Sequence, residues 1–440
     1  MVKGSGVDYS TIRLSDLSSM RLLIVTDAFP PKCGGSGWST FYLARALLAR
    51  GHRVEIIQPK RGAPRWSTRT YEGLTVTEFG YAASNVPGLR AWQRAAALDR
   101  SLAVFLAERA READVIHAQH LLTIPPAVSA GRVAHVPVVS TVRDYWPVCL
   151  YGTLWRDSGP CPICRGGELA RCLAQKYGAL ARPFAPVALP FVRRELARRQ
   201  QALCESGAVI AVSHYVAEKL NGIVAPERLH VVPNLIDLAE TSRLAGCTDA
   251  LASAPGADEP AARCPLTANR YLLFIGKLNA LKGADLLPEI LQRAGVALKL
   301  IVLGDGELET RLKQEPQIEV RGWVSNQAAL GLLARTEALL FPSRWGEPLA
   351  RVLLEAQALG TPTVALDTGG TRDIITSEVN GLLAHDAVDF AAQLARLVND
   401  PALCEQLRRG AFQVAREKFS DTTVARQVEQ VYAKAKMSSA

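Results

Sequence analysis

Short apolar runs alternate with segments of helical periodicity along most of the chain, and this alternation constrains the fold most strongly. In the clearest unit, the run Ala338–Phe341 ends at Pro342, apolar residues then recur at helical spacing, and another run begins at Thr363. Strand–helix–strand units of this kind form parallel sheets covered by helices. The sequence therefore predicts an α/β protein with Rossmann-like parallel sheets.

Eight further apolar runs have the length of strands, and they fall into two groups. Residues 245–269, which are rich in Ala, Pro, Ser, Gly and Asp, separate the groups. A chain of 440 residues is also too long for one ordinary core. We expect two domains, 1–238 and 239–420, with 245–269 as a mobile insertion. The runs are Arg21–Thr26, Val54–Gln58, Val115–Gln119, Val136–Val142, Ala208–Ser213, Leu229–Pro233, Tyr271–Ile275 and Leu300–Leu303.

Two carboxylates, Glu347 and Glu355, stand eight residues apart after the run at 338–341. Pro348 suits the first turn of a helix, where its missing N–H costs nothing. A helix that starts after a parallel strand offers free amide donors and the positive end of its dipole. Eight helical residues rise about 12 Å, so the two carboxylates could meet hydroxyls on both sides of a pyrophosphate. Two ordinary surface carboxylates are the alternative interpretation.

Two lysines, Lys277 and Lys282, follow the predicted strand at 271–275. Cations beside free helix amides stabilise a leaving diphosphate. These two residues are therefore candidates for that role.

Several motifs in a fixed order resemble retaining glycosyltransferase family four. They are EPLARVLLE followed by Gly369-Gly370 (the EX7E motif), GKLNALKG at 276–283, LGDGELE at 303–309, RGWV at 321–324 and VVPNLID at 231–237. The resemblance implies the GT-B fold, in which two Rossmann-like domains face each other across a cleft. It also implies a nucleotide-sugar donor and a C-terminal helix, within 421–440, that crosses back to the N-terminal domain.

The same resemblance implies roles for individual residues. Glu347, Lys277 and Lys282 would be catalytic, with the lysines at the departing diphosphate, and Glu355 would bind the ribose. No metal ion is expected between the phosphates, and the sequence contains no Asp-x-Asp triplet. Trp323 could stack on a base, but we expect it in the core. The remaining donor-binding positions are Gly34, Gly35, Gly304, Val324, Pro348, Leu349 and Ala350.

Arg143 and Asp144 end the predicted strand at 136–142. Open α/β sheets bind ligands at the carboxyl ends of their strands. Many relatives have a histidine where this chain has Arg143, so the resemblance leaves open what takes its role. Asp144 is our candidate on the acceptor side, and a plain loop carboxylate is the alternative.

The chain has a net charge of +9, and five arginines gather within eighteen residues. A solvated helix face and contact with an anionic membrane both explain this cluster. Nucleic-acid binding is not expected, because aromatic residues do not interleave with the basic ones. No signal peptide and no membrane span is recognised, which predicts a cytoplasmic protein, peripheral on the inner face of the membrane if it binds there. The arginines are Arg182, Arg193, Arg194, Arg198 and Arg199.

Four of the nine cysteines lie within residues 149–172. Cys161 and Cys164 have the two-residue gap that lets both sulfurs reach one tetrahedral ion, and Cys149 and Cys172 flank them. We predict a structural zinc site, with no cofactor for the chemistry. A disulfide pair, an iron–sulfur centre and simply buried thiols remain alternatives.

Together these features predict a retaining glycosyltransferase. It would move a hexose-type sugar from a nucleotide diphosphate to a glycan, lipid-linked or small-molecule acceptor. A GT-B sugar-nucleotide epimerase, which needs no acceptor, and a non-catalytic nucleotide-sugar-binding subunit are the alternatives. A glycosidase is disfavoured, since that chemistry needs two carboxylates facing across a bond.

Overall fold

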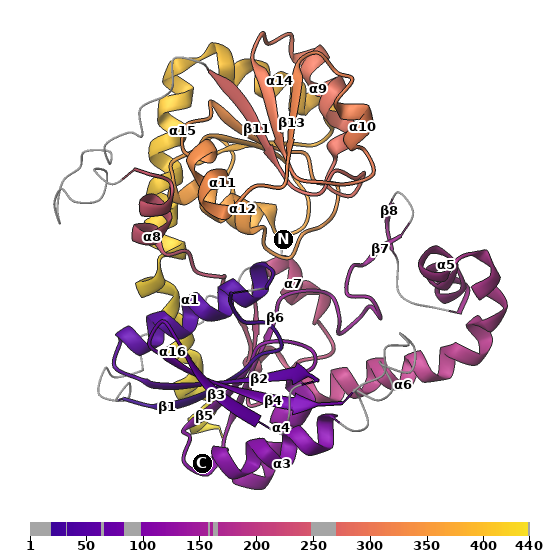
Figure 1. Cartoon of the computed structure of the whole chain (residues 1–440), viewed down its shortest axis with the longest axis vertical. Coiled ribbons are helices and arrows are strands. Elements are labelled where there is room, and N and C mark those ends of the chain that lie inside the picture. The colour runs from indigo at the N-terminus through magenta and orange to yellow at the C-terminus, as the bar shows by residue number, and fades with distance from the viewer. Residues whose placement is uncertain are drawn as a thin grey trace.

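The computed structural model describes residues 19–31, 33–62, 66–82, 98–156, 159–161, 166–247 and 270–438. These residues form two α/β units, one above the other in Figure 1, each built on its own sheet. The α/β prediction is therefore confirmed. Cys164 and most of the predicted insertion, residues 248–269, lie outside the described part of the chain.

The first sheet has eight strands in the order β10-β9-β6-β5-β1-β2-β4-β3. Its strand pairs are parallel except β3 with β4. Leu23 and Val25 of β1 face one core cluster, whereas Leu22 and Ile24 face another, so β1 is buried on both faces. The strands are β1 (Arg21–Val25), β2 (Arg53–Arg61), β3 (Trp66–Tyr71), β4 (Leu74–Tyr81), β5 (Val115–Ala118), β6 (Val138–Val142), β9 (Ala208–Ala211) and β10 (Leu229–Val231).

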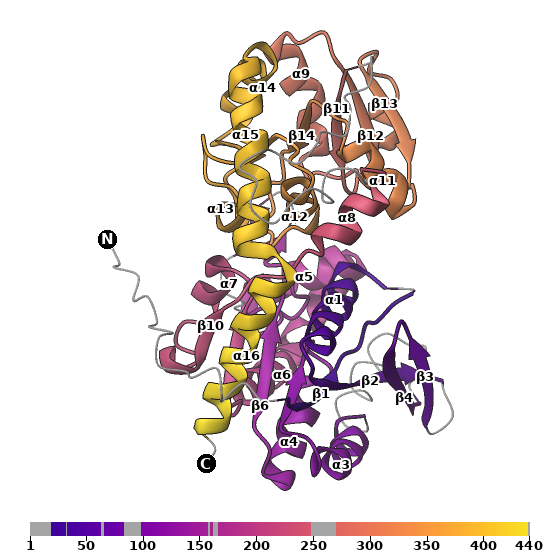
Figure 2. The same ribbon diagram turned by 90° about the vertical axis from the view of Figure 1, so that its left-hand side faces the viewer.

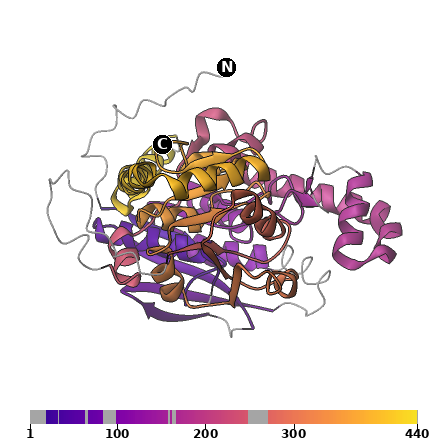
Figure 3. The same cartoon turned by 90° about the horizontal axis from the view of Figure 1, so that it is seen from above.

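Helices cover both faces of this sheet. Those with residues in the first cluster include α3 (Asp99–Ala110) and α4 (Ile124–Ala134), and α1 (Gly35–Ala49) contributes to the second. A small hairpin follows β6, and a helical extension, α5 to α6, projects from the body (Figure 3). The further elements are β7 (Trp155–Arg156), β8 (Gly159–Pro160), α5 (Gly166–Tyr177), η3 (Ala179–Phe184), α6 (Ala185–Cys204), α7 (His214–Lys219), η4 (Pro226–Arg228) and α8 (Leu238–Leu244).

The second sheet has six parallel strands in the order β13-β12-β11-β14-β15-β16. They are β11 (Tyr271–Ile275), β12 (Lys299–Leu303), β13 (Ile318–Gly322), β14 (Ala338–Phe341), β15 (Thr363–Leu366) and β16 (Leu382–Ala384). The helices between them are η6 (Ala284–Leu286), α9 (Leu287–Ala294), α10 (Glu309–Leu312), α11 (Asn326–Leu333), α12 (Arg351–Ala358), α13 (Thr371–Ile374) and α14 (Ala387–Asn399).

The last helices connect the two units along one side of the molecule (Figure 2). The helix α15 (Pro401–Val414) continues through a π-helical turn, η7 (Ala415–Phe419), into α16 (Asp421–Met437). On the first sheet, Tyr432 of α16 places its hydroxyl 2.7 Å from His117 Nδ1 of β5. Glu429 of α16 accepts hydrogen bonds from Arg50. The chain therefore ends on the unit in which it began.

None of the helices in the described ranges combines the length and the apolar character that crossing a membrane requires.

Candidate active site

Glu347 lies in the loop between β14 and α12, and its side chain is largely buried. The helix begins at Arg351, so the prediction that Pro348 lies in its first turn is wrong. Neighbouring loops hold the backbone in another conformation: Arg344 and Trp345 donate their N–H groups to Leu281 O, at 3.0 and 3.1 Å. Gly370 N donates to Glu347 O at 2.7 Å. The expected alignment of Glu347 and Glu355 along one helix is therefore also wrong.

Lys282 donates to Glu347 Oε1 at 2.6 Å, which joins two residues that the sequence predicted as catalytic. Gly283 makes this approach feasible. Its φ is 70°, and a Cβ atom there would lie 1.8 Å from Pro342 O. Lys282 Nζ also lies 5.0 Å from the centroid of the Trp345 ring, within cation–π range. Lys277 is exposed on the loop after β11 and lies outside this contact.

A cavity of about 190 Å³ adjoins the Lys282–Glu347 pair. Arg351 lines it, and its Nε donates to Glu355 Oε1 at 3.0 Å. One terminal nitrogen of Arg351, Nη1, is buried without a hydrogen-bond partner. Burial raises the pKa of Glu355, and the charge of Arg351 opposes that shift. Glu355, predicted to bind the ribose, thus lies beside the cavity but is paired with Arg351.

The N-terminal unit reaches Arg351 through helix α1. The Arg351 guanidinium lies 5.0 Å from the centroid of the Tyr42 ring, and its Cδ would lie 3.8 Å from a Cβ added to Gly35. Gly34 is the N-cap of α1 and has free space around it. The close approach occurs at Gly37, where a Cβ would lie 2.6 Å from Cys33 Sγ. Sequence reasoning did not identify Gly37, and it did not identify the contact between Tyr42 and Arg351, which are far apart in the chain.

The other predicted donor-binding residues lie in the loops that follow strands of the second sheet. Gly304 has a φ of 137°, and a Cβ there would lie 1.9 Å from Gly276 O, so two strand ends meet closely. Val324 is half-buried. Trp323 is 79% exposed, so the expectation that it packs in the core is wrong. Leu349 and Ala350 are buried in the first core cluster, so their side chains contribute packing there.

Arg143 and Asp144 make hydrogen bonds within the first unit. Arg143 Nε donates to Asn234 Oδ1 at 3.0 Å, and its Nη1 donates to Gln119 Oε1. Asp144 Oδ1 accepts from Trp146 N at 2.8 Å, as in a tight turn. Burial raises the pKa of the Asp144 carboxyl to about 6. These bonds account for the local conformation and leave the role of Asp144 toward an acceptor as a prediction.

Residues of the N-terminal unit also hold the loop that carries Glu347. The Tyr145 hydroxyl donates to Gly346 O, and Trp345 Nε1 donates to Thr153 O at 2.6 Å. The rings of Tyr145 and Trp345 pack edge to face, with centroids 6.3 Å apart. The two units thus meet around Lys282 and Glu347.

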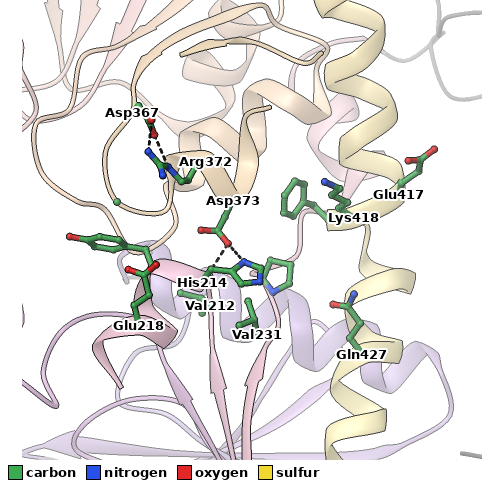
Figure 4. Close-up of a pocket in the computed structure, with 14 residues that line it drawn as sticks. Val212, His214, Glu218, Val231, Asp367, Arg372, Asp373, Glu417, Lys418 and Gln427 are labelled. Carbon is green, nitrogen blue, oxygen red and sulfur yellow. Dashed lines mark hydrogen bonds and ion pairs between the residues drawn. The ribbon is translucent and has the colours of Figure 1, made fainter. Parts of the chain in front are cut away.

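A larger cavity, of about 740 Å³, lies between the units beside α16 (Figure 4). His214 of α7 points up into it and places Nδ1 2.6 Å from Asp373 Oδ1 of α13. Arg372 in its wall is paired with Asp367. Four carboxylates line this cavity, so it suits a diphosphate less well than the site at Lys282. They belong to Glu218, Asp367, Asp373 and Glu417.

Three of the four cysteines predicted to hold zinc, Cys149, Cys161 and Cys172, line one small cavity with Leu154 and Leu169. Cys149 and Cys161 are free thiols. Within the described ranges no three His, Cys, Asp or Glu residues are grouped so that they could hold a metal ion. Because Cys164 lies outside those ranges, the zinc site stays a prediction.

Comparisons with known proteins agree with this architecture. Residues 33–240 match the model "Glycosyltransferase Family 4", and residues 269–400 match "Glycosyl transferases group 1". The chain is 28% identical to glycogen synthase of Mycobacterium tuberculosis over 450 aligned positions, which cover 95% of each chain. It is 30% identical to D-inositol 3-phosphate glycosyltransferase of Xylanimonas cellulosilytica over 267 positions, covering 57% of this chain and 62% of that one.

Solved structures with the same fold include Alr3699/HepE of Anabaena in complex with UDP. Its TM-score is 0.60 at 18% identity, and the match covers 93% of this chain and 98% of that one. The catalytic domain of starch synthase IV of Arabidopsis thaliana, bound to ADP and acarbose, has a TM-score of 0.62 at 18% identity, covering 96% and 100%. The GT-B fold predicted from the sequence is thereby confirmed.

Proposed function

The chain belongs to glycosyltransferase family 4, and we propose that it transfers a hexose-type sugar from a nucleotide diphosphate with retention of configuration. The acceptor is a hydroxyl of a glycan, a lipid-linked sugar or a small molecule. The chemistry proceeds without a metal ion at the diphosphate.

The observation that carries this proposal is the buried Lys282–Glu347 pair beside Arg351. The ammonium of Lys282 and the guanidinium of Arg351 both adjoin the cavity at the interdomain contact. A departing nucleoside diphosphate gains negative charge, and preformed cations in a water-poor site stabilise that charge. Arg351 Nη1 has no hydrogen-bond partner, so a phosphate oxygen can accept from it without breaking a bond.

In the proposed reaction the bond between the anomeric carbon and the diphosphate oxygen breaks, and both electrons stay with the diphosphate. The acceptor hydroxyl forms the new bond to the same carbon on the same face. Its proton passes to the diphosphate oxygen that has just left. Lys282 stabilises the leaving group, and Glu347 positions the ammonium of Lys282 and the sugar hydroxyls.

For the donor base and the acceptor, we propose only a chemical class. The fold neighbours are described with UDP and with ADP, and the relatives are named for glycogen and for inositol phosphate. Thermal shift against UDP, GDP, ADP and their sugar derivatives distinguishes the bases. A ligand at 100 times its Kd raises stability by about 2.7 kcal/mol.

The proposal is tested by Lys282→Ala and Glu347→Ala, made separately and assayed with the donor chosen by thermal shift. Each should lower turnover on the order of 100-fold or more, because a stabiliser of the leaving group, or its positioning partner, is lost. Lys313→Ala and Glu309→Ala remove an ion pair of similar length, 2.7 Å, from a more exposed position and should leave turnover unchanged.

Near-normal turnover by a folded Lys282→Ala or Glu347→Ala variant would contradict these assignments. Anomeric proton NMR of the product distinguishes retention from inversion. The same spectra, recorded without acceptor, detect an epimerase. Full activity in a chelator is the expected result for metal-independent transfer.

A further inference from the structure

The segment α5–η3–α6 forms a helical extension that projects away from the N-terminal unit (Figures 1 and 3). Ala185, Val192 and Arg199 of α6 are buried, which defines its inward side. Arg199 Nη1 donates to Trp146 O at 3.1 Å, so this side is anchored to the body near Asp144. On the outward side, the described side chains are largely exposed.

An apolar stripe runs along the outward side. It consists of Tyr177, Leu180, Phe184, Val187 and Phe191, whose exposed fractions range from 46% to 88%. Tyr177 ends α5, Leu180 and Phe184 lie in η3, and Val187 and Phe191, four residues apart, lie on one face of α6. Thirteen large apolar residues are exposed in the described chain, and five of them fall within these fifteen positions. Such a concentration marks an interaction surface.

The charge around the apolar stripe has one sign. Glu168 and Glu195 are the acidic residues of 166–204, and both are paired with arginines. The sequence-based expectation of a basic face from Arg193 to Arg199 is partly wrong, because Arg198 pairs with Asp99 and Arg199 is buried. Exposed basic residues nevertheless surround the stripe, namely Arg171, Lys176, Arg182, Arg193 and Arg194.

We propose that this extension docks the protein on an anionic lipid bilayer. The apolar stripe enters the boundary between headgroups and acyl chains, and the surrounding arginines and lysine contact lipid phosphates. An amphipathic surface of this composition lies in the plane of a membrane interface, and its affinity combines buried apolar area with attraction to anionic lipids. Charge complementarity identifies the occupant. The acidic side chains of the extension are paired with arginines, so the excess charge of its surface is positive and matches anionic lipid headgroups.

The test uses the full chain and flotation with two kinds of vesicle, phosphatidylcholine alone and phosphatidylcholine with about 30% phosphatidylglycerol. The protein should float with the anionic vesicles and much less with the neutral ones. Recovery should fall when salt is raised from about 0.05 to 0.5 M, because salt screens the contribution of the basic residues.

Two double variants separate the apolar and the charged contributions. Leu180→Ser with Phe184→Ser should lower the partition coefficient on the order of 100-fold, because two apolar side chains no longer enter the membrane. Arg193→Gln with Arg194→Gln should lower it about 25-fold, or roughly fivefold per residue. Val104→Ser with Val133→Ser, and Arg311→Gln with Arg426→Gln, alter equally exposed residues elsewhere and should float like wild type.

Equal recovery with neutral and anionic vesicles at low salt would overturn the proposal. So would unchanged flotation of both extension variants with unchanged thermal stability. Light scattering tests the other candidate for binding to the stripe, a second copy of the chain. The stripe would instead bind a second copy of the chain if two results were found together. Wild type would be a dimer that the Leu180→Ser/Phe184→Ser substitutions dissociate, and the protein would not be recovered with vesicles.

Discussion

The carboxylates in the interior of this protein differ in the groups that donate hydrogen bonds to them. Glu347 accepts from Lys282 and Glu355 accepts from Arg351, so each has a cation as partner. Asp144 has the N–H of Trp146 instead, and burial raises its pKa to about 6. Ionisation of Asp144 therefore opposes folding at neutral pH.

This difference leads to a pH-dependent prediction for Asp144→Asn. The pKa of Asp144 is higher in the folded state than in the unfolded one, so its ionisation costs nothing below about pH 4 and its full cost above pH 6. The asparagine oxygen still accepts from Trp146 and cannot ionise. We expect equal stability at pH 4 and a gain of roughly 2 kcal/mol at pH 8, measured by urea unfolding.

A stability difference between Asp144→Asn and wild type that stays the same from pH 4 to pH 8 would contradict this account. Transfer rates of the same variant address its other predicted role. A large loss of turnover in the stabilised protein is expected if the carboxylate contacts the acceptor.

At the scale of single elements, the loops after the strands decide where the site residues stand. The loop after β11 presses against the end of β14 at Gly283, and the loop after β12 presses against the β11 loop at Gly304. Hydrogen bonds from Arg344 and Trp345 to Leu281 complete the contact. This packing brings Lys282 to Glu347 although 64 residues stand between them in the chain.

We therefore predict that Gly283→Ala damages both fold and activity. Its Cβ would lie 1.8 Å from Pro342 O, so the backbone must move and Lys282 with it. The expected cost is about 3 kcal/mol in unfolding free energy, with a marked loss of turnover. Gly295→Ala is the matched control, since its φ of 62° is similar and nothing lies near its Cβ. That variant should lose about 1 kcal/mol and keep its turnover.

The cysteine-rich segment before α5 leads to a second prediction at this scale. Cys149, Cys161 and Cys172 already line one cavity. We predict that these three sulfurs and Cys164 come together on a zinc ion, which commonly stabilises segments with little apolar material. Elemental analysis of protein purified without chelator should find about one zinc per chain, and Cys161→Ser with Cys164→Ser should lose it together with stability. Cys204→Ser and Cys404→Ser, outside the segment, should retain the metal.

Less than a tenth of a zinc per chain, with unchanged stability of the Cys161→Ser/Cys164→Ser variant, would mean that these cysteines bind no metal ion.

For the whole molecule, the important contacts are those between the two units. Tyr145 and Trp345 each donate one hydrogen bond across the interface beside Glu347, and His214 meets Asp373 at the larger cavity. Helices α15 and α16, joined by η7, link the units along one side of the molecule (Figure 2). Interfaces between domains of one chain commonly permit relative motion of the domains.

Replacement of Tyr145 and Trp345 by Phe removes both hydrogen bonds and keeps an aromatic ring at each position, with a smaller ring at 345. At about 1 kcal/mol for each bond, the equilibrium between separated and closed domains should shift about 30-fold toward separation. Small-angle scattering should show a larger radius of gyration, and a bound nucleotide should reverse part of the increase. Tyr271→Phe removes a comparable bond within one domain, to Leu332 O at 2.8 Å, and should leave the radius unchanged. An unchanged radius in the double variant would show that these bonds do not hold the closed arrangement.

Much of the fold and part of the site followed from the sequence, because the responsible signals are local. Strands such as β11 and β14 are continuous apolar runs, since both faces of a parallel sheet are covered by helices. Within the two large sheets, the strands that sequence analysis did not predict are β3, β4, β13 and β16, and they lie at or next to the sheet edges. Exposure at an edge removes the need for an apolar run: in β13, Glu319 and Arg321 face solvent.

The resemblance of the sequence motifs to a known family singled out Lys282 and Glu347, whereas tertiary contacts decided which partners they have. Helix α12 begins at Arg351 because bonds from Gly370 and to Leu281 hold the preceding loop in a non-helical conformation. Arg351 bridges Glu355 and Tyr42 because the two units meet there. Local propensity sets which segments can form helices and strands, but the partner of a buried charge is chosen by the packing of segments that are distant in the chain.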